Sequence, residues 1–341
     1  MEALVKNKEI WKIALPIMLG NLAQTIITFT DTAFLGHLGV VSLGASMMAG
    51  MYYFVYTTLA LGFAVGIQII IARRFGEKRF NEIATIFNHG AIFVAILGIS
   101  LLLLLLLFSK SILVHIIDSP NIFAESMEYI KFRQFGIIFV CFNYLYRSLY
   151  IGLSNTKVIT YSTLLMAVVN IFLDYCLIFG KLGFPEMGIG GAALASLSAE
   201  ISASISFTIF TFFKVHLKDI KVFSRHKIEM PLLKNILSIG APTMVQRLLS
   251  FSAWFIFFIM IEKMGELAIG ISSIVRSAYM ILIIPAMGFA TTADTIVSRL
   301  IGQNKNDYVM PTVKRILLNC IICSIPLALL SFVFPTALVS I

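Results

Sequence analysis

The sequence predicts an all-α polytopic membrane protein built as two lobes, with a six-helix N-lobe followed by the first three helices of a C-lobe. Of its 341 residues, 59% are hydrophobic and only 13% are charged, and the mean hydropathy is +0.95. A soluble domain has roughly 45–50% apolar and about 25% charged residues. Long apolar segments recur along the whole chain, and its first part is repeated later. We therefore expect the chain to lie in a lipid bilayer.

Nine segments are apolar and long enough to be membrane-spanning helices. A helix needs about 20 apolar residues to cross roughly 30 Å of hydrocarbon. Several segments exceed this minimum, so we expect them to be tilted or to extend beyond the bilayer. The predicted spans are 10–35, 44–72, 84–108, 124–150, 157–180, 189–214, 235–261, 267–300 and 312–339.

Basic residues gather at one end of these spans. Lys6 and Lys12 flank the start of the first span, Arg73 and Lys78 follow the second, and the segment 214–235 is also basic. Cytoplasmic loops are enriched in Lys and Arg. The pattern predicts a multi-pass protein of the inner or plasma membrane with its N-terminus in the cytoplasm. Because the net charge of +9 is distributed between spans, it indicates topology and not nucleic-acid binding, and we expect a monomer.

An internal repeat divides the chain into its two lobes. Residues 10–80 align without a gap to residues that lie 226 positions later. Six helices separate the two copies, so both enter the membrane from the same side, as in transporters with two rocking halves. We predict an N-lobe over 1–216, a cytoplasmic linker over 217–233 and an incomplete C-lobe over 234–341. The identical pairs include Pro16 and Pro242, Gly39 and Gly265, Gly62 and Gly288, Phe63 and Phe289, Arg73 and Arg299, and Gly76 and Gly302.

Two acids and an amide form a candidate cation site in the N-lobe. Asp31 and Asp174 lie inside the first and fifth spans, and at about 1.5 Å per residue both stand at the same depth. Asn170 lies one helical turn from Asp174 on the same face. Ionisable groups inside a bilayer normally face a protein interior or a watery cavity. Carboxyl groups in such a place suit a proton or, with the amide oxygen, a Na⁺ ion.

Other residues within the spans are candidate contacts for the cation or a substrate. Asp294 occupies the repeat position of Gln68, and Arg247 and Arg276 are also intramembrane. We expect paired ions between the seventh and eighth spans, with a structural role favoured over substrate contact. A Met- and Tyr-rich stretch over 47–56 favours core packing, although such surfaces also suit lipophilic or cationic ligands. The candidate contacts are Gln24, Met51, Tyr53, Arg276 and Asp294.

Several motifs resemble those of the multidrug and toxic compound extrusion (MATE) transporters along essentially the whole chain. The first helix resembles that family in IALPIMLGNLAQTIITFTDTAFLGHLG, and the fifth to sixth helices in NIFLDYCLIFGKLGFPEMGIGGAALAS. The resemblance implies twelve helices in two lobes around a central cleft. It implies cation-coupling roles for Asp31, Asn170 and Asp174, with the Ser196 hydroxyl near that site.

The sequence also departs from the family pattern. Some members carry a glutamate in the middle of the seventh helix, where the nearest position here is Ser250. Helices ten to twelve are absent, so we expect a chain that is C-terminally truncated relative to the family.

The predicted function is secondary active efflux of organic cations or lipophilic drugs and toxins in exchange for H⁺ or Na⁺, by rocker-switch alternating access. No phosphate-binding loop is present, so no cofactor besides the coupling ion is expected. One alternative is a lipid-linked oligosaccharide flippase of the same superfamily, and another is a fragment that does not transport. An enzyme is not expected, because the spans contain no nucleophile–base pair or metal cluster.

Overall fold

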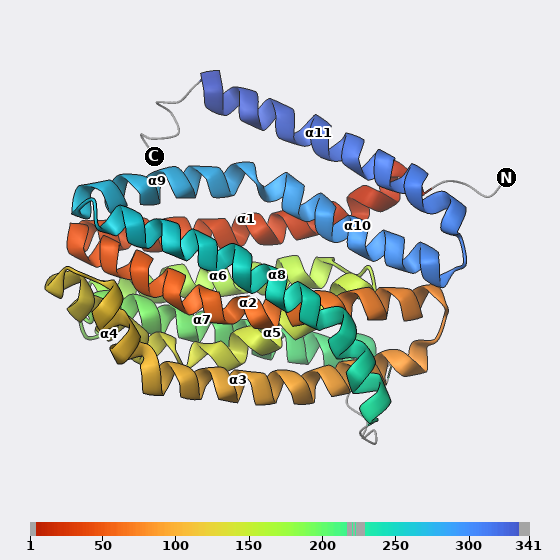
Figure 1. Cartoon of the computed structure of the whole chain (residues 1–341), viewed down its shortest axis with the longest axis horizontal. Coiled ribbons are helices and arrows are strands. Elements are labelled where there is room, and N and C mark those ends of the chain that lie inside the picture. Colours follow the sequence, from red (N-terminus) through yellow and green to blue (C-terminus); the bar gives the residue numbers. More distant parts are fainter. Residues whose placement is uncertain (1–4, 217–219, 221, 223–228, 334–341) are drawn as a thin grey trace.

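The described chain is helical throughout. The computed structural model describes residues 5–216, 220, 222 and 229–333, and these contain no β-strand (Figure 1). A π-helical turn, Thr211–His216, extends α7, and a short 3-10 helix, Asn306–Tyr308, precedes α11. The helices are α1 (Asn7–Leu38), α2 (Val40–Gly76), α3 (Phe80–Ile116), α4 (Pro120–Arg133), α5 (Gly136–Gly152), α6 (Lys157–Ile178), α7 (Gly188–Phe210), α8 (Met230–Glu262), α9 (Glu266–Leu282), α10 (Ile284–Gly302) and α11 (Val309–Val333).

The predicted all-α membrane architecture is confirmed. Eight described helices are long and apolar enough to cross a membrane, and α4 with α5 makes a ninth span if that bent pair is counted as one. The predicted last span, 312–339, extends past Val333 into residues outside the described part of the chain. Most of the predicted linker, 217–233, also lies outside it. The domain boundaries therefore stay predictions.

Two predicted spans are interrupted in the structure. The segment 124–150 is broken between Arg133 and Gly136, where α4 and α5 meet at 57°. The segment 267–300 is divided into α9 and α10 at Ile283, directly before a first turn that contains Pro285. Proline lacks the backbone N–H that would continue the helical hydrogen bonds, and a first turn accommodates it without the loss of such a bond. Apolar composition alone gave no sign of either break.

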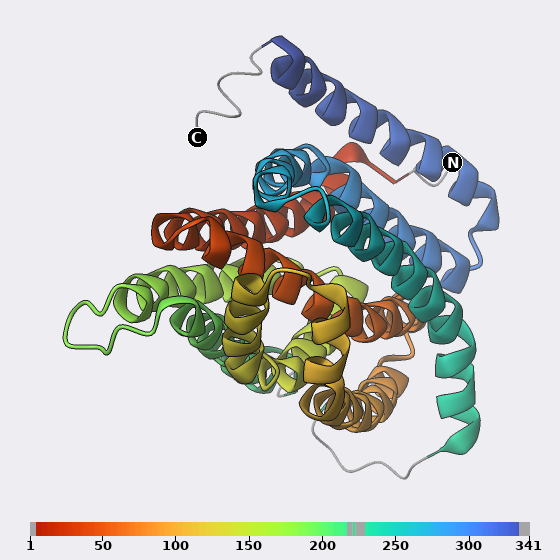
Figure 2. The same ribbon diagram turned by 60° about the vertical axis from the view of Figure 1, so that its left-hand side comes forward.

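The helices form two groups that meet along α2. In the first group, α2 packs against α4 and α5, and α1 packs along α6. From the second group, α8 lies alongside α2 in both views, and α10 contacts α1 and α2 (Figures 1 and 2). Helix α11 lies at the edge of the bundle against α10. The two predicted lobes thus share a seam made by α1, α2, α8 and α10.

Contacts across this seam are reciprocal, as the repeat predicts. A Cβ atom on Gly76 would collide with the backbone of Arg299, and one on Gly302 would collide with the backbone of Arg73. Gly76 and Gly302 are equivalent positions of the repeat, and so are Arg73 and Arg299. The same holds farther along the seam, where Gly62 abuts Met244 and Gly288 abuts Met18. Reciprocal contacts of this kind mark a two-fold arrangement, so the repeat in the sequence is also a repeat in space.

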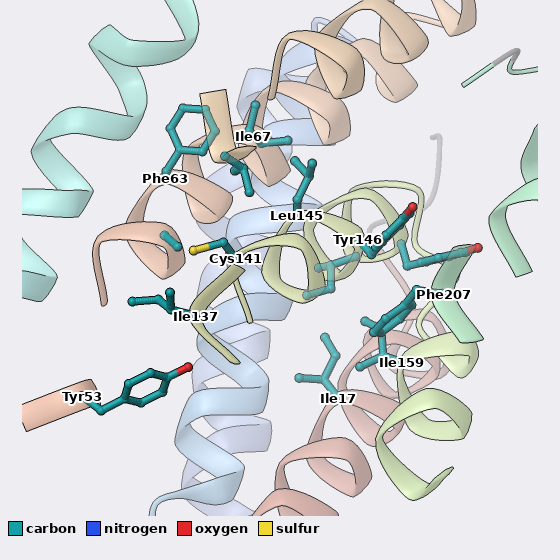
Figure 3. Close-up of a cluster of buried hydrophobic side chains, with 14 of the residues drawn as sticks. Ile17, Tyr53, Phe63, Ile67, Ile137, Cys141, Leu145, Tyr146, Ile159 and Phe207 are labelled. Carbon is teal, nitrogen blue, oxygen red and sulfur yellow. The ribbon is translucent and has the colours of Figure 1, made fainter. Parts of the chain in front are cut away.

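Apolar side chains separate into a core and an outer face. Phe63 and Ile67 of α2 pack against Cys141 and Leu145 of α5 (Figure 3), and all four are fully buried. Helix α3 shows the opposite surface, with Leu107 69% exposed although it is apolar. A soluble monomer rarely leaves such a helix face uncovered. The exposed face of α3 is what contact with lipid tails requires.

Candidate functional site

Two threonines fix how α6 lies along α1. Pro16 has no backbone N–H, so the carbonyl of Lys12 lacks its usual helical donor. The Thr156 hydroxyl donates to that Lys12 carbonyl at 3.4 Å, and the Thr160 hydroxyl donates to the Pro16 carbonyl at 2.8 Å. Both pairs are 144 residues apart in sequence. These two hydrogen bonds set the register of the two parallel helices.

This register brings the predicted acids together. Continued at the same offset, it places Asp31 level with residue 175, about 22 Å beyond the threonines. The carboxyl groups of Asp31 and Asp174 interact directly, and the Asn170 side chain also acts on Asp31. Asn170 and Asp174 are fully buried, and Asp31 is half-buried. The structure thus joins the three predicted residues at one position, while their role stays a prediction.

Most polar atoms of this trio have no hydrogen-bond partner. The unpartnered atoms are Oδ1 of Asp31, both carboxyl oxygens of Asp174 and both polar atoms of Asn170. Two ionised carboxylates cannot satisfy each other, because a carboxylate oxygen only accepts hydrogen bonds. An unpartnered buried polar atom lowers the free energy of unfolding by about 1–3 kcal/mol. Such atoms are normally satisfied by a proton, a water or an ion. The trio is therefore a candidate cation site.

A buried ion pair that the sequence analysis missed lies beside the trio. Arg133 donates two hydrogen bonds to the Glu200 carboxylate, at 2.7 and 2.5 Å, and its guanidinium lies 4.2 Å from the centre of the Tyr53 ring. Asn143 donates to the Glu200 carbonyl at 3.0 Å. The positive charge of Arg133 acts on Asp31. A charged residue inside each of two apolar spans was the available signal for this pair.

The break between α4 and α5 makes room for that pair. Gly136 begins α5, and a Cβ atom there would lie 2.5 Å from Nη1 of Arg133 and would collide with the Glu200 carboxylate. Arg133 ends α4. The bend therefore turns the last side chain of α4 into the bundle, where Glu200 of α7 receives it. A straight helix with a larger residue at 136 would not leave this space.

The other predicted N-lobe contacts do not join the trio. Tyr53 and Met51 are buried, with Tyr53 held in the Arg133 network. Gln24 is exposed on α1 and Ser196 is half-buried on α7. Within the described residues, no hydrogen bond links Gln24 or Ser196 to the two acids.

The predicted ion pairing in the second lobe is only partly present. Asp294 is exposed on α10 and interacts electrostatically with Arg247 of α8, but the two form no salt bridge. The guanidinium of Arg276 lies 6.0 Å from the centre of the Phe258 ring, and its Nε atom has no hydrogen-bond partner. No carboxylate among the described residues forms a salt bridge with Arg276. The structure does not gather these three residues into one site.

Na⁺ and a proton place different demands on the residues of the trio. Within the described residues, no group of three or more His, Cys, Asp or Glu side chains is placed to hold a metal ion. A Na⁺ ion at the trio would take the Asn170 amide oxygen together with the two carboxylates, and hard cations accept such mixed oxygen ligands. A proton needs only one of the two carboxyl groups, because neighbouring carboxylates do not both ionise at low cost.

Comparison with known proteins gives one consistent family. The sequence model of the MatE family matches residues 16–176 and 242–341. The two matched segments begin at Pro16 and Pro242, which are equivalent positions of the repeat. The match therefore follows the two copies found in the sequence.

Curated relatives and a solved structure agree with this match. A probable multidrug resistance protein NorM from Thermotoga maritima is 26% identical over 98% of this chain and 72% of its own length. Another from Agrobacterium fabrum is 25% identical over 92% of this chain and 67% of its length. A structure of the MATE multidrug transporter DinF-BH, solved in complex with a ligand, covers all of this chain and 76% of its own, with a TM-score of 0.89 at 20% identity. The last likeness concerns the fold alone.

Proposed function

This chain belongs to the MatE family of membrane transporters, and from that premise we propose that it exports organic cations or other lipophilic compounds in exchange for H⁺ or Na⁺. The relatives named above are multidrug resistance proteins, and the solved relative is a multidrug transporter with a ligand bound. The substrate class proposed here follows theirs. The family consists of transporters and not enzymes, so the buried acids are to be understood as binding groups.

The observation that carries the proposal is the trio of Asp31, Asn170 and Asp174. Its unpartnered oxygens lie between α1 and α6, with Asp174 about one turn before the end of α6 at Ile178. Binding a proton or Na⁺ there removes the repulsion between the two carboxylates. Release of the cation restores it. The change in repulsion between the two carboxylates on binding and release can shift the packing of α1.

Helix α1 is suited to pass that shift to the other lobe. Asp31 lies in its second half, next to α6 of the first lobe. In its first half, Trp11 stacks edge-on against Phe289 of α10 at 5.4 Å, and Met18 abuts Gly288. One helix thus contacts the cation site at one end and the second lobe at the other. We infer rocker-switch alternating access, in which cation binding at Asp31 changes how α1 meets α10.

The proposed orientation follows the basic residues. Lys6 and Lys12 lie at the start of α1, and Arg73 lies in the last turn of α2, which ends at the same end of the molecule (Figure 1). Because cytoplasmic segments are enriched in Lys and Arg, we infer that this end faces the cytoplasm. The protein then resides in the inner or plasma membrane, acting as a monomer in a lipid bilayer.

Dye efflux from liposomes containing the full chain tests this function. A pH gradient and a Na⁺ gradient are imposed separately, which identifies the coupling ion. Asp174→Asn should remove the gradient-driven rate while leaving insertion and folding intact, because the amide binds neither a proton nor Na⁺ as a carboxylate does. Asp118→Asn, at an exposed acid between α3 and α4, is the matched control. Gradient-driven efflux by Asp174→Asn at the wild-type rate would contradict the proposal.

The same assay separates the alternative functions. A flippase of lipid-linked sugars would be expected to line its cleft with several basic residues, whereas Arg247 acts on Asp294 and Arg276 packs near Phe258. We therefore rank that function lower. A chain that does not transport would show no efflux with either gradient, although it inserts normally.

A further inference from the structure

A second polar feature lies far from the trio, at the end of the molecule where α1 begins. A cavity of about 620 Å³ opens there between the start of α1 and the ends of α2 and α10, with Tyr308 of the following 3-10 helix at its edge. Its walls therefore come from both lobes. The lining residues are Val5, Lys6, Lys8, Glu9, Lys12, Phe75, Arg299, Leu300, Gln303, Lys305 and Tyr308.

The cavity walls are strongly basic. Five of the lining residues are Lys or Arg, and Glu9 is the only acidic residue among them. Glu9 is already in a salt bridge with Arg299. Lys8 and Lys12 are four residues apart on α1, where like charges destabilise a helix. The lining residues therefore carry a net positive charge around a concave space, which an anion would neutralise.

The backbone that carries these lysines is fixed in place. Arg315 donates to the Val5 carbonyl at 2.7 Å, and Trp11 Nε1 donates to Asn319 at 3.2 Å. Asn319 also donates to the Asn7 side chain at 3.3 Å. Two of these hydrogen bonds thus tie the first two turns of α1 to α11, and the third ties Val5, which precedes α1, to the same helix. A preorganised site loses little freedom when its ligand binds.

The start of α1 adds to the positive potential. Lys6 precedes the helix, and among the described residues no side chain accepts a hydrogen bond from the N–H groups of Asn7 and Lys8. Uncapped N–H groups at a helix start favour anions. Phe75, Leu300 and Tyr308 give the cavity an apolar wall beside the charges. The combination fits a ligand with an anionic head and an attached apolar or neutral part.

We propose that this cavity binds a phosphate-bearing anion and thereby joins the two lobes at the α1 end. Lys8 and Lys12 of the first lobe and Arg299 of the second would share the phosphate oxygens. The same end holds the reciprocal contact of Gly76 with Arg299, so a bound anion stabilises the arrangement in which the lobes touch there. Phospholipid headgroups and free phosphate compounds share this chemistry, and the proposed cytoplasmic orientation makes both accessible.

Fluorescence of Trp11 provides a direct test on the full chain in detergent. In a Trp254→Phe background, Trp11 is the remaining tryptophan and lies one residue from Lys12. The probes are inorganic phosphate, short-chain phosphatidylglycerol, and short-chain phosphatidylcholine of the same acyl length. Saturable binding of phosphatidylglycerol alone identifies a headgroup site, and saturable binding of phosphate as well identifies a site for free anions. Absence of saturation with both anionic probes, or equal affinity for phosphatidylcholine and phosphatidylglycerol, would overturn the proposal.

A charge-removal pair shows whether binding takes place in the cavity. Lys8→Gln with Lys12→Gln should raise the dissociation constant by about tenfold or more, and a bound probe should raise the thermal midpoint of the parent but not of this variant. Lys157→Gln with Lys314→Gln removes the same charge from exposed positions outside the cavity. Equal weakening by both pairs would mean non-specific attraction and would overturn the assignment. This test reads binding, so its failure is independent of whether the chain exports drugs.

Discussion

The two copies of the repeat keep the same packing but carry different chemistry. Gly62, Phe63 and Gly76 recur at the same offset and serve the same seam. Asp31, in contrast, corresponds to Phe257, an exposed apolar residue.

The second lobe has its polar residues at other positions of the repeat. Arg247 occupies the position of Asn21, which accepts a hydrogen bond from Arg147 at 3.2 Å. Asp294 occupies the position of Gln68, which donates to Thr295 across the seam at 3.1 Å. Asp31 of the first lobe is half-buried beside a second acid, and Asp294 of the second lobe is exposed near an arginine. Positions that hold the lobes together are kept in both copies, and positions that bind are free to differ.

The largest expected contrast is in transport. Asp31→Asn should lower gradient-driven efflux to the level of empty liposomes, because it removes one of the two carboxylates of the trio. Asp294→Asn should leave a substantial rate, since Asp294 does not meet another carboxylate. Initial rates of dye efflux at matched protein content measure both. An equal loss of efflux rate in the two variants would contradict the proposed functional difference between the lobes.

Removal of an arginine should destabilise the protein more in the first lobe than in the second. Arg133→Leu leaves Glu200 buried without its partner, and breaking a buried pair costs about 3–5 kcal/mol. Arg247→Leu removes a charge that forms no salt bridge and should cost less than about 1 kcal/mol. Thermal unfolding of the purified variants compares the two. The double variant Arg133→Leu, Glu200→Leu should recover part of the loss, and no recovery would argue against the pair.

The reciprocal glycines should respond alike. Gly76→Ala and Gly302→Ala each place a methyl group against backbone of the opposite lobe, and overpacking of this kind costs about 1–3 kcal/mol. Thermal midpoints of both variants should fall by similar amounts. Gly183→Ala is a poor control because Gly183 has a positive φ, whereas Gly36→Ala meets no atom within 4 Å and should be nearly neutral. A loss confined to one of the two seam variants would contradict the two-fold contact.

The smallest effect concerns the threonines that set the helix register. Thr160→Val removes the hydrogen bond to the Pro16 carbonyl and should cost about 1 kcal/mol. Thr163→Val is a useful comparison, because Thr163 lies on the same helix, is buried and is three residues farther along. If the register matters for the trio, Thr160→Val should also weaken cation-dependent efflux more than Thr163→Val does.

Much of the site followed from the sequence because helices have a constant rise. Counting from the basic ends of two parallel spans placed Asp31 and Asp174 at one depth, and the 144-residue register confirms that placement. The ion pair of Arg133 and Glu200 was not predicted, for a physical reason. They meet only because α4 ends at a bend, and the depth of a side chain beyond a bend cannot be counted from the nearest loop. Tyr53 was assigned to packing or ligand contact, but its arginine partner was not foreseen.

The paired seam of Gly76 and Gly302 has the form of a homodimer interface contained within one polypeptide. In a true homodimer every substitution appears in both subunits, so an acid acquired by one first helix would also enter the other. Joining the halves in a single gene removes that obligation. Each half then accumulates its own changes wherever the shared interface does not forbid them. An acid at position 31 and a phenylalanine at the equivalent position 257 form an asymmetry that such a fused pair of halves can carry.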